Sequence, residues 1–343
     1  MNSPAAPLLL PMEARLVAKL PEDGLWQFEP KWDGFRCMIL KDGAKLELRS
    51  KSGKPLARYF PEIARGFAQF KCRRFVLDGE LIIPVGSSLS FDALQMRLHP
   101  AHSRVVKLAR DTPALFMAFD MLSDDGKELL SRPLGDRRRA LERLYRREQQ
   151  PAIMRLSPYS RDLAEARRWL GKAGGGALDG VVAKSLRGPY EPGERAMLKV
   201  KCLRTADCVV GGFRYATDSK QVGSMLLGLY NADGMLDHVG FSSGISARER
   251  PHLTRMFEKL RGGRGFTGSA PGGPSRWSTD RSTEWYPLKT KLVAEVQYDQ
   301  VTGDRFRHGT RFLRWRPDKA PRQCTFGQLR QEVRPAKLLA ALR

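Results

Sequence analysis

The chain has 343 residues, which is enough for two domains that each bury a core. Hydrophobic residues make up 41% and aromatic residues 9% of it, a composition that excludes an intrinsically disordered chain. Sixty lysines and arginines outnumber 37 acidic residues, and the net charge of +23 indicates a polyanionic partner, with nucleic acid ahead of a membrane surface. No apolar run approaches membrane-spanning length and no secretory signal is recognisable, so we expect a cytoplasmic protein with no membrane partner.

The cysteines and histidines form no metal or disulfide pattern. The five cysteines are scattered, odd in number and without any C-x-x-C pair. His99 and His102 lie three residues apart, but no third ligand type accompanies them. We therefore expect reduced cysteines that mostly pack in the core, and no zinc site.

The first predicted elements form an antiparallel hairpin. Residues 26–48 predict strands, with Phe35, Cys37 and Ile39 at every second position and alternation again at residues 45–49, and residues 41–43, Lys-Asp-Gly, are typical of the turn between two strands. Lys31, Asp33 and Arg36 stand at the mouth of this hairpin, around a glycine that suits a backbone turn. By itself this group of charges is also compatible with an ordinary surface turn.

Later strands carry charged side chains where apolar ones are expected. Residues 75–83 predict a strand in which Asp78 and Glu80 share one face, and two acidic residues there require a ligand or a basic partner. Asp179 opens another predicted strand, at residues 178–184.

The strand predicted at residues 198–201 places Lys199 and Lys201 on one face. Adjacent ammonium groups repel each other, so a bound anion is the economical explanation for the pair, although flanking acidic residues could also offset the charge. A further buried strand is predicted at residues 115–122, which include Phe119.

The predicted secondary structure changes after Cys202. Before it, helices are predicted at residues 61–70, 136–148 and 162–172. After it, short strands separated by glycine turns, with one helix at residues 247–260, suggest a small β-barrel. The domain boundary should lie near residues 203–206.

Taken together, these segments resemble a known family. The run Lys-Trp-Asp-Gly-Phe-Arg at residues 31–36 resembles the K-x-D-G-x-R motif of the covalent nucleotidyltransferases, which include DNA ligases, RNA ligases and mRNA capping enzymes. Residues 311–319 are similar to the R-x-D-K signature of ATP-dependent DNA ligases. Other segments match the family's further motifs in order, at residues 48–50, 77–80, 118–120, 179–184 and 198–201. The resemblance covers residues 12–335, and it extends to the small bacterial ligases of the ligase C kind and to the ligase domain of ligase D.

The resemblance implies an α+β fold with two domains. Residues 1–203 would form the adenylation (nucleotidyltransferase) domain, which is ATP-grasp-like and built mainly from antiparallel sheets with helices. Residues 204–343 would form an OB-fold β-barrel, a fold that commonly binds nucleic acid. The hinge between them would lie at residues 201–206, so that the second domain closes over ATP and then turns to DNA.

The activity implied by the family is ATP-dependent sealing of DNA nicks. Lys31 would attack the α-phosphate of ATP, form lysyl-AMP and release pyrophosphate. AMP would then pass to the 5′-phosphate of the nick, and the 3′-hydroxyl would displace it. Attack requires the neutral amine, which cationic neighbours favour.

The resemblance also implies a role for each site residue of the first domain. Glu29 would contact the adenine edge, Phe119 would stack on the adenine face, and Glu80 would bind the ribose hydroxyls. Arg36 and Arg49 would hold ATP phosphates and the nick termini, where a guanidinium fork matches the oxygens.

The resemblance assigns phosphate binding, metal binding and DNA contacts to further residues. Lys199 and Lys201 would bind the α-phosphate and offset its developing charge. Asp179, with Glu80, would hold Mg²⁺ or Mn²⁺. Asp33 would join Arg36 and Arg49 in contacting DNA. Four residues of the second domain would orient the leaving pyrophosphate: Arg314, Arg316, Asp318 and Lys319. The family more often has glutamate at the position of Asp179, and the shorter side chain leaves the role of this residue open.

The sequence disfavours two alternatives to a DNA ligase. An RNA ligase or a capping guanylyltransferase of the same superfamily is disfavoured by the R-x-D-K signature and by the resemblance over the second domain. A non-catalytic scaffold that binds DNA ends is disfavoured by the complete set of Lys31, Glu80, Lys199 and Lys201. We expect a monomer that acts on nicked double-stranded DNA in repair, at the bacterial nucleoid, with repair proteins as further partners.

Overall fold

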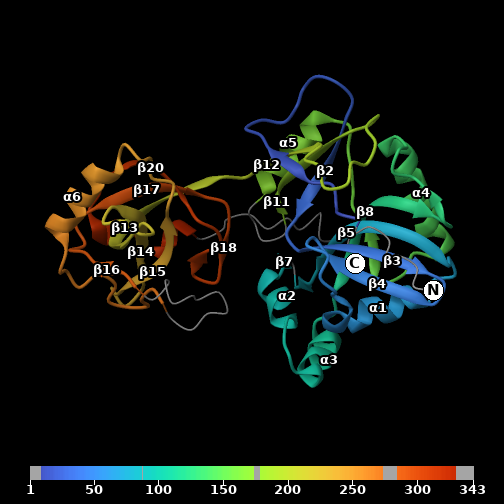
Figure 1. Ribbon diagram of the computed structural model, residues 1–343, viewed down its shortest axis with the longest axis horizontal. Coiled ribbons are helices and arrows are strands. Elements are labelled where there is room, and N and C mark those ends of the chain that lie inside the picture. Colours follow the sequence, from blue (N-terminus) through green and yellow to red (C-terminus); the bar gives the residue numbers. More distant parts are fainter. Residues whose placement is uncertain (1–8, 87, 174–177, 273–283, 330–343) are drawn as a thin grey trace. The chain divides into compact units, whose positions relative to one another are not determined.

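The computed structural model describes residues 9–86, 88–173, 178–272 and 284–329 of the chain (Figure 1). The chain divides into two compact units between Cys202 and Leu203. The outer ends of the two predicted domains, residues 1–8 and 330–343, lie outside the described residues. Every helix within the described ranges is too short or too polar to span a lipid bilayer.

The first unit combines strands and helices. Its strands are β1 (Ala14–Leu16), β2 (Trp26–Trp32), β3 (Phe35–Asp42), β4 (Lys45–Ser50), β5 (Arg74–Ile82), β6 (Pro84–Val85), β7 (Ser88–Leu89), β8 (Leu115–Asp124), β9 (Lys127–Glu128), β10 (Met154–Leu156), β11 (Leu178–Ser185) and β12 (Met197–Lys201). Its helices are α1 (Pro61–Ala68), α2 (Phe91–Arg97), α3 (His102–Asp111), α4 (Leu134–Arg147) and α5 (Leu163–Lys172), with a 3₁₀ turn η1 (Ala57–Tyr59).

One sheet of this unit has the strand order β1-β12-β11-β2. β11 pairs antiparallel with both β12 and β2, whereas β1 runs parallel to β12. Helix α5 packs against β2 and β11, and its Ala166 and Trp169 are buried in the core beneath the sheet. The functional side chains of this sheet therefore lie on the face opposite to α5.

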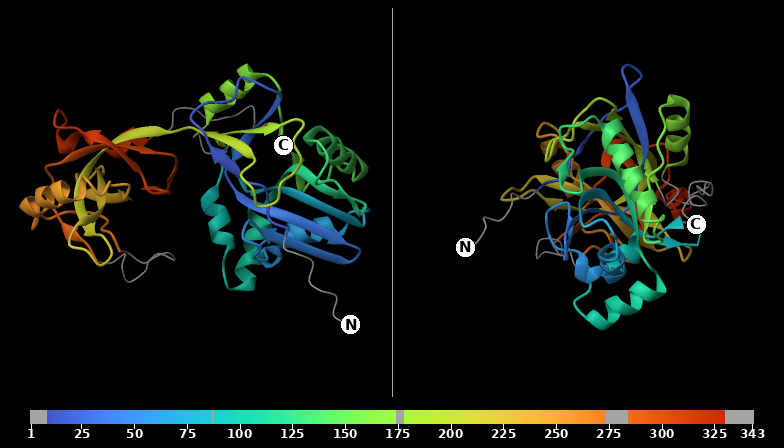
Figure 2. Two further views of the ribbon diagram at one scale, coloured as in Figure 1. Left: turned by 45° about the horizontal axis from the view of Figure 1, so that its top comes forward. Right: turned by 90° about the vertical axis from the view of Figure 1, so that its right-hand side faces the viewer.

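The other sheet has the order β10-β8-β5-β3-β4, with β9 paired to β8. The hairpin of β3 and β4 is the pair of long blue strands in the left view of Figure 2. Cys37 and Ile39 on β3 and Leu77 on β5 are fully buried in the main core of the unit. Because side chains alternate along a strand, Arg36 and Asp78 must lie on the opposite face.

The second unit is dominated by antiparallel strands. Its elements are β13 (Arg204–Tyr215), β14 (Val222–Tyr230), β15 (Leu236–Ser242), α6 (Arg250–Leu260), β16 (Tyr286–Pro287), β17 (Val293–Tyr298), β18 (Val301–Thr302), β19 (Arg305–Phe306) and β20 (Arg311–Trp315), with 3₁₀ turns η2 (Pro321–Gln323) and η3 (Phe326–Leu329). Its main sheet has the order β15-β14-β13-β17-β20, with β16 paired to β13, and α6 packs on β14. This arrangement is consistent with the expected OB-fold.

The predicted α+β class, with mainly antiparallel sheets, is confirmed. The helix predicted at residues 136–148 is α4, and the strand predicted at residues 115–122 is β8, which continues to Asp124. Helices α2 and α3 were not predicted. They are short, and α3 carries charged residues close to its few buried positions, Val105 and Ala109, so its apolar stripe is narrow.

Candidate nucleotide site

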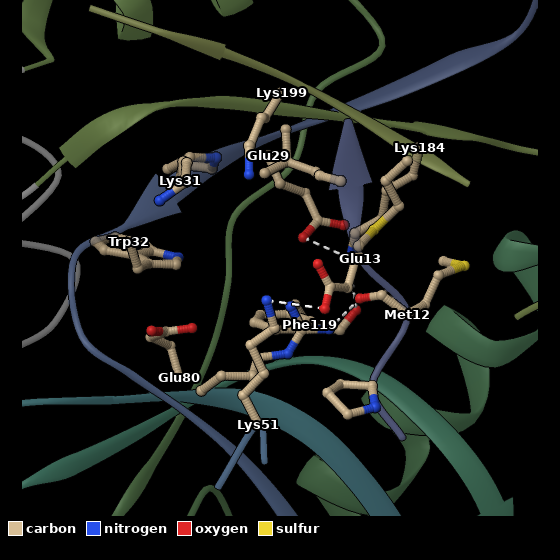
Figure 3. Close-up of a pocket in the computed structure, with 16 residues that line it drawn as sticks. Met12, Glu13, Glu29, Lys31, Trp32, Lys51, Glu80, Phe119, Lys184 and Lys199 are labelled. Atoms are coloured by element: carbon tan, nitrogen blue, oxygen red, sulfur yellow. Dashed lines mark hydrogen bonds and ion pairs between the residues drawn. The ribbon is translucent and has the colours of Figure 1, made fainter. Parts of the chain in front are cut away.

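A pocket of about 150 Å³ lies in the first unit, between the functional faces of the two sheets (Figure 3). Lys31 and Lys199 reach it from the first sheet, and Glu80 reaches it from the second. The residues that line it are Pro11, Met12, Glu13, Ala14, Glu29, Pro30, Lys31, Trp32, Arg36, Lys51, Glu80, Phe119, Val182, Lys184, Met197 and Lys199. The pocket therefore brings together most of the predicted site residues of the first domain.

Sheet register explains why Lys31 and Lys201 lie side by side. Gly180 on the middle strand β11 is opposite Lys31 on β2 and also opposite Lys201 on β12. Lys31 Nζ donates to Asp179 Oδ2 at 2.6 Å, and Lys201 Nζ lies 3.3 Å from the same oxygen. One carboxylate therefore neutralises part of the charge of two lysines, so flanking acid is present beside the lysine pair.

A β-bulge places the Asp179 carboxylate on this face. The register of β11 and β2 shifts between Leu178 and Gly180, and such a bulge turns a side chain out of the regular alternation. Gly180 has a φ of +152°, and a Cβ there would lie 2.0 Å from the carbonyl oxygen of Val200. The backbone at this point therefore requires glycine at position 180, and the aspartate before it supplies the carboxylate.

Lys199 belongs to the next row of the same sheet. Val182 on β11 is opposite Glu29 on β2 and Lys199 on β12. Burial lowers the pKa of Lys199, and the charges of Lys31 and Lys201 lower it further. An anion in the pocket would relieve this repulsion.

Glu29 is held by two donors from its own sheet. Its Oε1 accepts a hydrogen bond from Gln27 Nε2 at 2.8 Å, and its Oε2 accepts one from Lys184 Nζ at 2.9 Å. Lys184 Nζ also lies 4.5 Å from the centroid of the Phe119 ring. The positions predicted to contact the adenine edge and face are thus joined by one lysine.

Arg36 is fixed by a buried carboxylate on the neighbouring strand. Its Nε and Nη2 donate to Asp78 at 2.6 and 2.5 Å, and Asp78 also accepts a hydrogen bond from the Tyr190 hydroxyl at 2.6 Å. Burial opposes the charge of Arg36, but Asp78 outweighs it and raises the pKa of the guanidinium. The Arg36 Cζ lies 4.7 Å from the Phe119 ring centroid. Asp78 therefore has the basic partner that its place in the strand required.

Glu80 is the acidic group of β5 that faces the pocket. Burial raises its pKa to about 7, against the attraction of Arg36 and Lys31. Asp33 and Asp78 add to the rise through their negative charges. Near neutral pH this carboxyl is present in both forms, so it can donate as well as accept hydrogen bonds.

Arg49 does not line the pocket. Its Nε donates to Glu47 Oε2 at 2.7 Å, next to it on β4. Lys51, two residues further along, does line the pocket and pairs with Glu13 at 2.8 Å. The cation that this segment contributes to the pocket is Lys51, which was not among the predicted site residues.

The donor groups present fit a divalent metal that binds together with a phosphate ligand. Asp179 Oδ1 is buried and has no hydrogen-bond partner within the described part of the chain. The described residues contain no cluster of three or more His, Cys, Asp or Glu side chains that could hold a metal. Mg²⁺ is typically held by one or two carboxylates together with substrate phosphates and water. Asp179 and Glu80 are carboxylates of the type that such a site uses, although only Glu80 lines the pocket.

The R-x-D-K residues form a compact ion network in the second unit, just after β20. Arg316 donates through Nη1 to Asp207 at 2.9 Å and through Nη2 to Asp318 at 2.8 Å. Lys319 Nζ donates to Asp207 Oδ2 at 2.7 Å. The hydrogen bond from Arg316 lowers the pKa of Asp318 to about 2.

Sequence reasoning missed the partners that hold the predicted residues. Arg314 pairs with Glu295 on β17 at 2.6 Å, a contact across two strands that no motif reveals. Asp207, Lys184 and Tyr190 were also missed. Of these, Lys184 carried a signal, since a lysine that follows a run of apolar residues in a buried strand requires a counter-charge.

Residues 12–201 match the family described as ATP dependent DNA ligase domain, and residues 218–319 match ATP dependent DNA ligase C terminal region. DNA ligase C1 of Mycolicibacterium smegmatis is 42% identical over 96% of both chains. The multifunctional non-homologous end joining DNA repair protein LigD of Mycobacterium tuberculosis is 31% identical over 86% of this chain and 37% of that one.

A solved structure of a Lig E DNA ligase shares the fold. It has a TM-score of 0.56 and 18% identity, and the match covers 89% of this chain and 100% of that one. Two family matches in the expected order, and a relative of 42% identity along almost the whole length, agree with the lysine-centred pocket described above. The chain belongs to the ATP-dependent DNA ligase family.

Proposed function

We propose that this ligase seals nicks carrying a 3′-hydroxyl and a 5′-phosphate in duplex DNA through a lysyl-AMP intermediate on Lys31. The observation that supports this most directly is the environment of the Lys31 amine. It lies in a pocket beside Lys199, with Asp179 at 2.6 Å. An amine flanked by phosphate-binding cations is the arrangement that nucleophilic attack on an α-phosphate requires.

The residues of the pocket divide the work of the first step. Lys31 supplies the nucleophile, while Lys199 and Lys201 bind the α-phosphate and offset the charge that develops on it. Glu29 and Phe119 bind adenine, and the ribose hydroxyls are the proposed ligands of Glu80. The Lys31 amine also forms an ion pair with the Asp179 carboxylate.

A divalent ion, Mg²⁺ or Mn²⁺, is part of the proposal. Asp179, whose Oδ1 is buried without a partner among the described residues, would hold it with Glu80. When bound, the ion would neutralise charge on the phosphate. Lys199 and Lys201 supply further positive charge for the phosphate beside the Lys31 amine.

Arg36, Arg49 and Asp33 are proposed to contact the DNA, and residues of the second unit are proposed to orient pyrophosphate. The residues proposed to orient pyrophosphate are Arg314, Arg316, Asp318 and Lys319. They belong to the second of two proposed domains, which spans residues 204–343 and follows an adenylation domain of residues 1–203. With a net charge of +23 the protein should bind nicked duplex in a strongly salt-dependent way. We propose that it acts as a monomer in DNA repair, at the nucleoid in the bacterial cytoplasm, together with other repair proteins.

The test is covalent labelling by ATP that carries the label in its α-phosphate. The protein is first treated with pyrophosphate to remove any AMP already bound, then incubated with labelled ATP and Mg²⁺ or Mn²⁺, and denatured. Wild type and a Lys45→Ala control, which alters an exposed lysine of β4, should retain the label, and Lys31→Ala should not. A wild type without label refutes the proposal. Transfer of the label to a nicked RNA duplex in preference to nicked DNA would favour an RNA ligase instead.

A further inference from the structure

Asp207 is the buried carboxylate of the ion network in the second unit, and it has no place in the steps proposed above. It lies on β13, and its side chain is 10% exposed. Both of its oxygens accept from Arg316 Nη1, at 2.9 and 3.1 Å, and Oδ2 also accepts from Lys319 Nζ at 2.7 Å. One carboxylate therefore holds both the first and the last residue of the R-x-D-K signature.

The strand pairing makes the Asp207 charge costly. Strands β13, β17 and β20 are neighbours in the main sheet of the second unit (Figure 1). Asp207 is directly opposite Glu295 on β17, and like charges at opposite positions of two strands destabilise a sheet. Arg316 relieves the repulsion, since its Nη1 lies 3.8 Å from Glu295 Oε2 as well as 2.9 Å from Asp207 Oδ1. Apolar residues could join these strands without that cost, so the charges suggest a role other than stability.

The backbone of Asp207 is fixed by a side chain of the turn η3. Its amide donates to Gln328 Oε1 at 2.9 Å, and Gln328 Nε2 donates to the Asp207 carbonyl oxygen at 3.1 Å. The pairing of β13 with β14 starts at Val209, so Gln328 supplies at Asp207 the pair of hydrogen bonds that a neighbouring strand would otherwise make. Asp207 is therefore an anchor of defined position for the two cations.

The second carboxylate of the network differs from Asp207 in its exposure. Asp318 accepts from Arg316 Nε at 3.0 Å and from Nη2 at 2.8 Å, and its side chain is 60% exposed. A ligand can therefore displace Asp318 more easily than it can displace the buried Asp207. The Nε and Nη2 edge of a guanidinium matches two phosphate oxygens, and the ammonium of Lys319 has further N–H donors beside the one that meets Asp207.

We propose that Asp207 is a positioning residue that holds Arg316 and Lys319 in the arrangement that receives the pyrophosphate part of ATP. The inference rests on the proposed function, which assigns pyrophosphate to the R-x-D-K residues. Asp207 itself would not touch the nucleotide, because a carboxylate repels phosphate. Without its charge the two cations would repel each other and lose their common anchor. The first step would then slow, whereas sealing of an adenylylated nick, which releases no pyrophosphate, would not.

The experiment applies three assays to the full-length protein. Self-adenylylation is measured by covalent labelling with α-labelled ATP over a range of concentrations. Sealing is measured on a pre-adenylylated nick without ATP. In the reverse of the first step, pyrophosphate attacks lysyl-AMP and re-forms ATP, so loss of the label gives the half-saturating concentration of pyrophosphate.

The variants separate the charge of Asp207 from its shape. Asp207→Asn removes the charge and nearly keeps the shape, and Asp207→Glu restores the charge. The matched control is Asp237→Asn, because Asp237 is a carboxylate of β15 in the same unit whose partners are Asn231, at 2.9 Å, and the amide of Ser269, at 2.6 Å, rather than R-x-D-K residues.

Asp207→Asn should lower the efficiency of self-adenylylation by about 10-fold and raise the half-saturating pyrophosphate concentration by a similar factor, because misplacing a group that orients a reactant has costs of this order or more. Its sealing of the pre-adenylylated nick should stay close to the wild-type rate. Asp237→Asn should match wild type in all three assays, and Asp207→Glu should recover part of the loss. A general disturbance of the fold would not separate the assays in this way.

Unchanged self-adenylylation in Asp207→Asn overturns the inference, and so does an equal loss in self-adenylylation and sealing. An Asp207→Glu variant no better than Asp207→Asn would also overturn it, since the charge would then not be what holds the cations. Should Asp207→Asn fail to fold, Gln328→Ala removes the two hydrogen bonds that fix the Asp207 backbone and keeps the charge. The same selective loss, of smaller size, is expected of it, and an unchanged or uniform result overturns the inference.

Arg316→Ala, measured in parallel, separates this inference from the proposed function. If Arg316→Ala slows self-adenylylation selectively and Asp207→Asn does not, the inference alone fails. Equal slowing of both steps by Arg316→Ala refutes the pyrophosphate role on which the inference rests. A wild type that takes no label from ATP refutes the proposed covalent step itself.

Discussion

Replacing Asp78 by asparagine changes no residue that lines the pocket, but it should loosen Arg36, which does line it. Asp78 is fully buried and receives two hydrogen bonds from Arg36 and one from Tyr190. Asparagine keeps one acceptor oxygen but presents an NH₂ group where the second oxygen was. Arg36 would then lose its counter-charge and one of its two bonds, so its fixed position against Phe119 would be lost.

The cost can be bounded from the geometry. Removing one partner of a buried ion pair typically costs about 3–5 kcal/mol. Arg36 retains a hydrogen bond to the carbonyl oxygen of Met12 at 3.1 Å, and its side chain is 21% exposed, so water can replace part of what is lost. We therefore expect a loss of about 3 kcal/mol in the free energy of unfolding of the first unit, measured by denaturant titration.

A matched control separates this structural cost from an effect on activity. Asp120 is opposite Asp78 on the neighbouring strand and forms a buried ion pair with Arg137, at 2.8 and 3.1 Å, but neither residue lines the pocket. Asp120→Asn should therefore be destabilised as much or more. At a temperature where both variants are folded, only Asp78→Asn should show slower self-adenylylation, by about 10-fold, or 1.4 kcal/mol in the barrier. Equal slowing of the two variants would show that Asp78 acts on stability alone.

Three further expectations concern single residues. Lys51→Ala should weaken covalent labelling by ATP more than Arg49→Ala does, because Lys51 lines the pocket whereas Arg49 pairs with Glu47 on its own strand. A larger effect of Arg49→Ala would contradict this and would indicate that Arg49 contacts ATP. Burial raises the pKa of Glu80 to about 7 in the folded state, whereas the unfolded chain releases this proton above about pH 4.3. Between these two pH values the unfolded state is therefore favoured increasingly, and Glu80 lowers the free energy of unfolding as the pH rises from about 4.3 to about 7. Glu80→Gln should accordingly melt higher than wild type at pH 8 but not at pH 4, without metal or nucleotide, and a difference that does not depend on pH would contradict this. Arg316→Ala should impair self-adenylylation more than the sealing of a pre-adenylylated nick, and equal loss in both steps would refute the role proposed for Arg316.

The strands and their functional faces could be read from the sequence because alternation is a local property. The paired lysines at residues 199 and 201 and the two carboxylates of β5 stand out by their spacing of two, whatever the rest of the chain does. Each pattern correctly indicated that a partner was needed. For Lys201 the partner is Asp179, and for Asp78 it is Arg36. The identity of these partners could not be read, because it depends on which strands become neighbours.

The bulge at Asp179 shows a second limit. A regular strand would place Asp179 on the face opposite to Gly180 and Val182, away from Lys31. The register shift between Leu178 and Gly180 brings its carboxylate to 2.6 Å from the Lys31 amine. An Asp-Gly pair is typical of many turns, so the sequence alone gave no reason to prefer a bulge within a strand. At Arg49 the motif pointed to a residue that does not reach the pocket. Arg49 pairs with Glu47 on the same strand, and Lys51 lines the pocket instead.

The ion pairs around the nucleotide pocket share an organisation that motif spacing conceals. Lys31 and Asp179 are 148 residues apart in the chain, Lys184 and Glu29 are 155 apart, and Arg36 and Asp78 are 42 apart. Each pair joins two adjacent strands of one sheet, and so the register of that sheet fixes which carboxylate meets which cation. A shift of one residue between β2 and β11 would turn one strand's charges away from their partners and expose its apolar side chains. Burial of the apolar face by α5 therefore also enforces the charge pairing on the opposite face, where Lys31 meets Asp179.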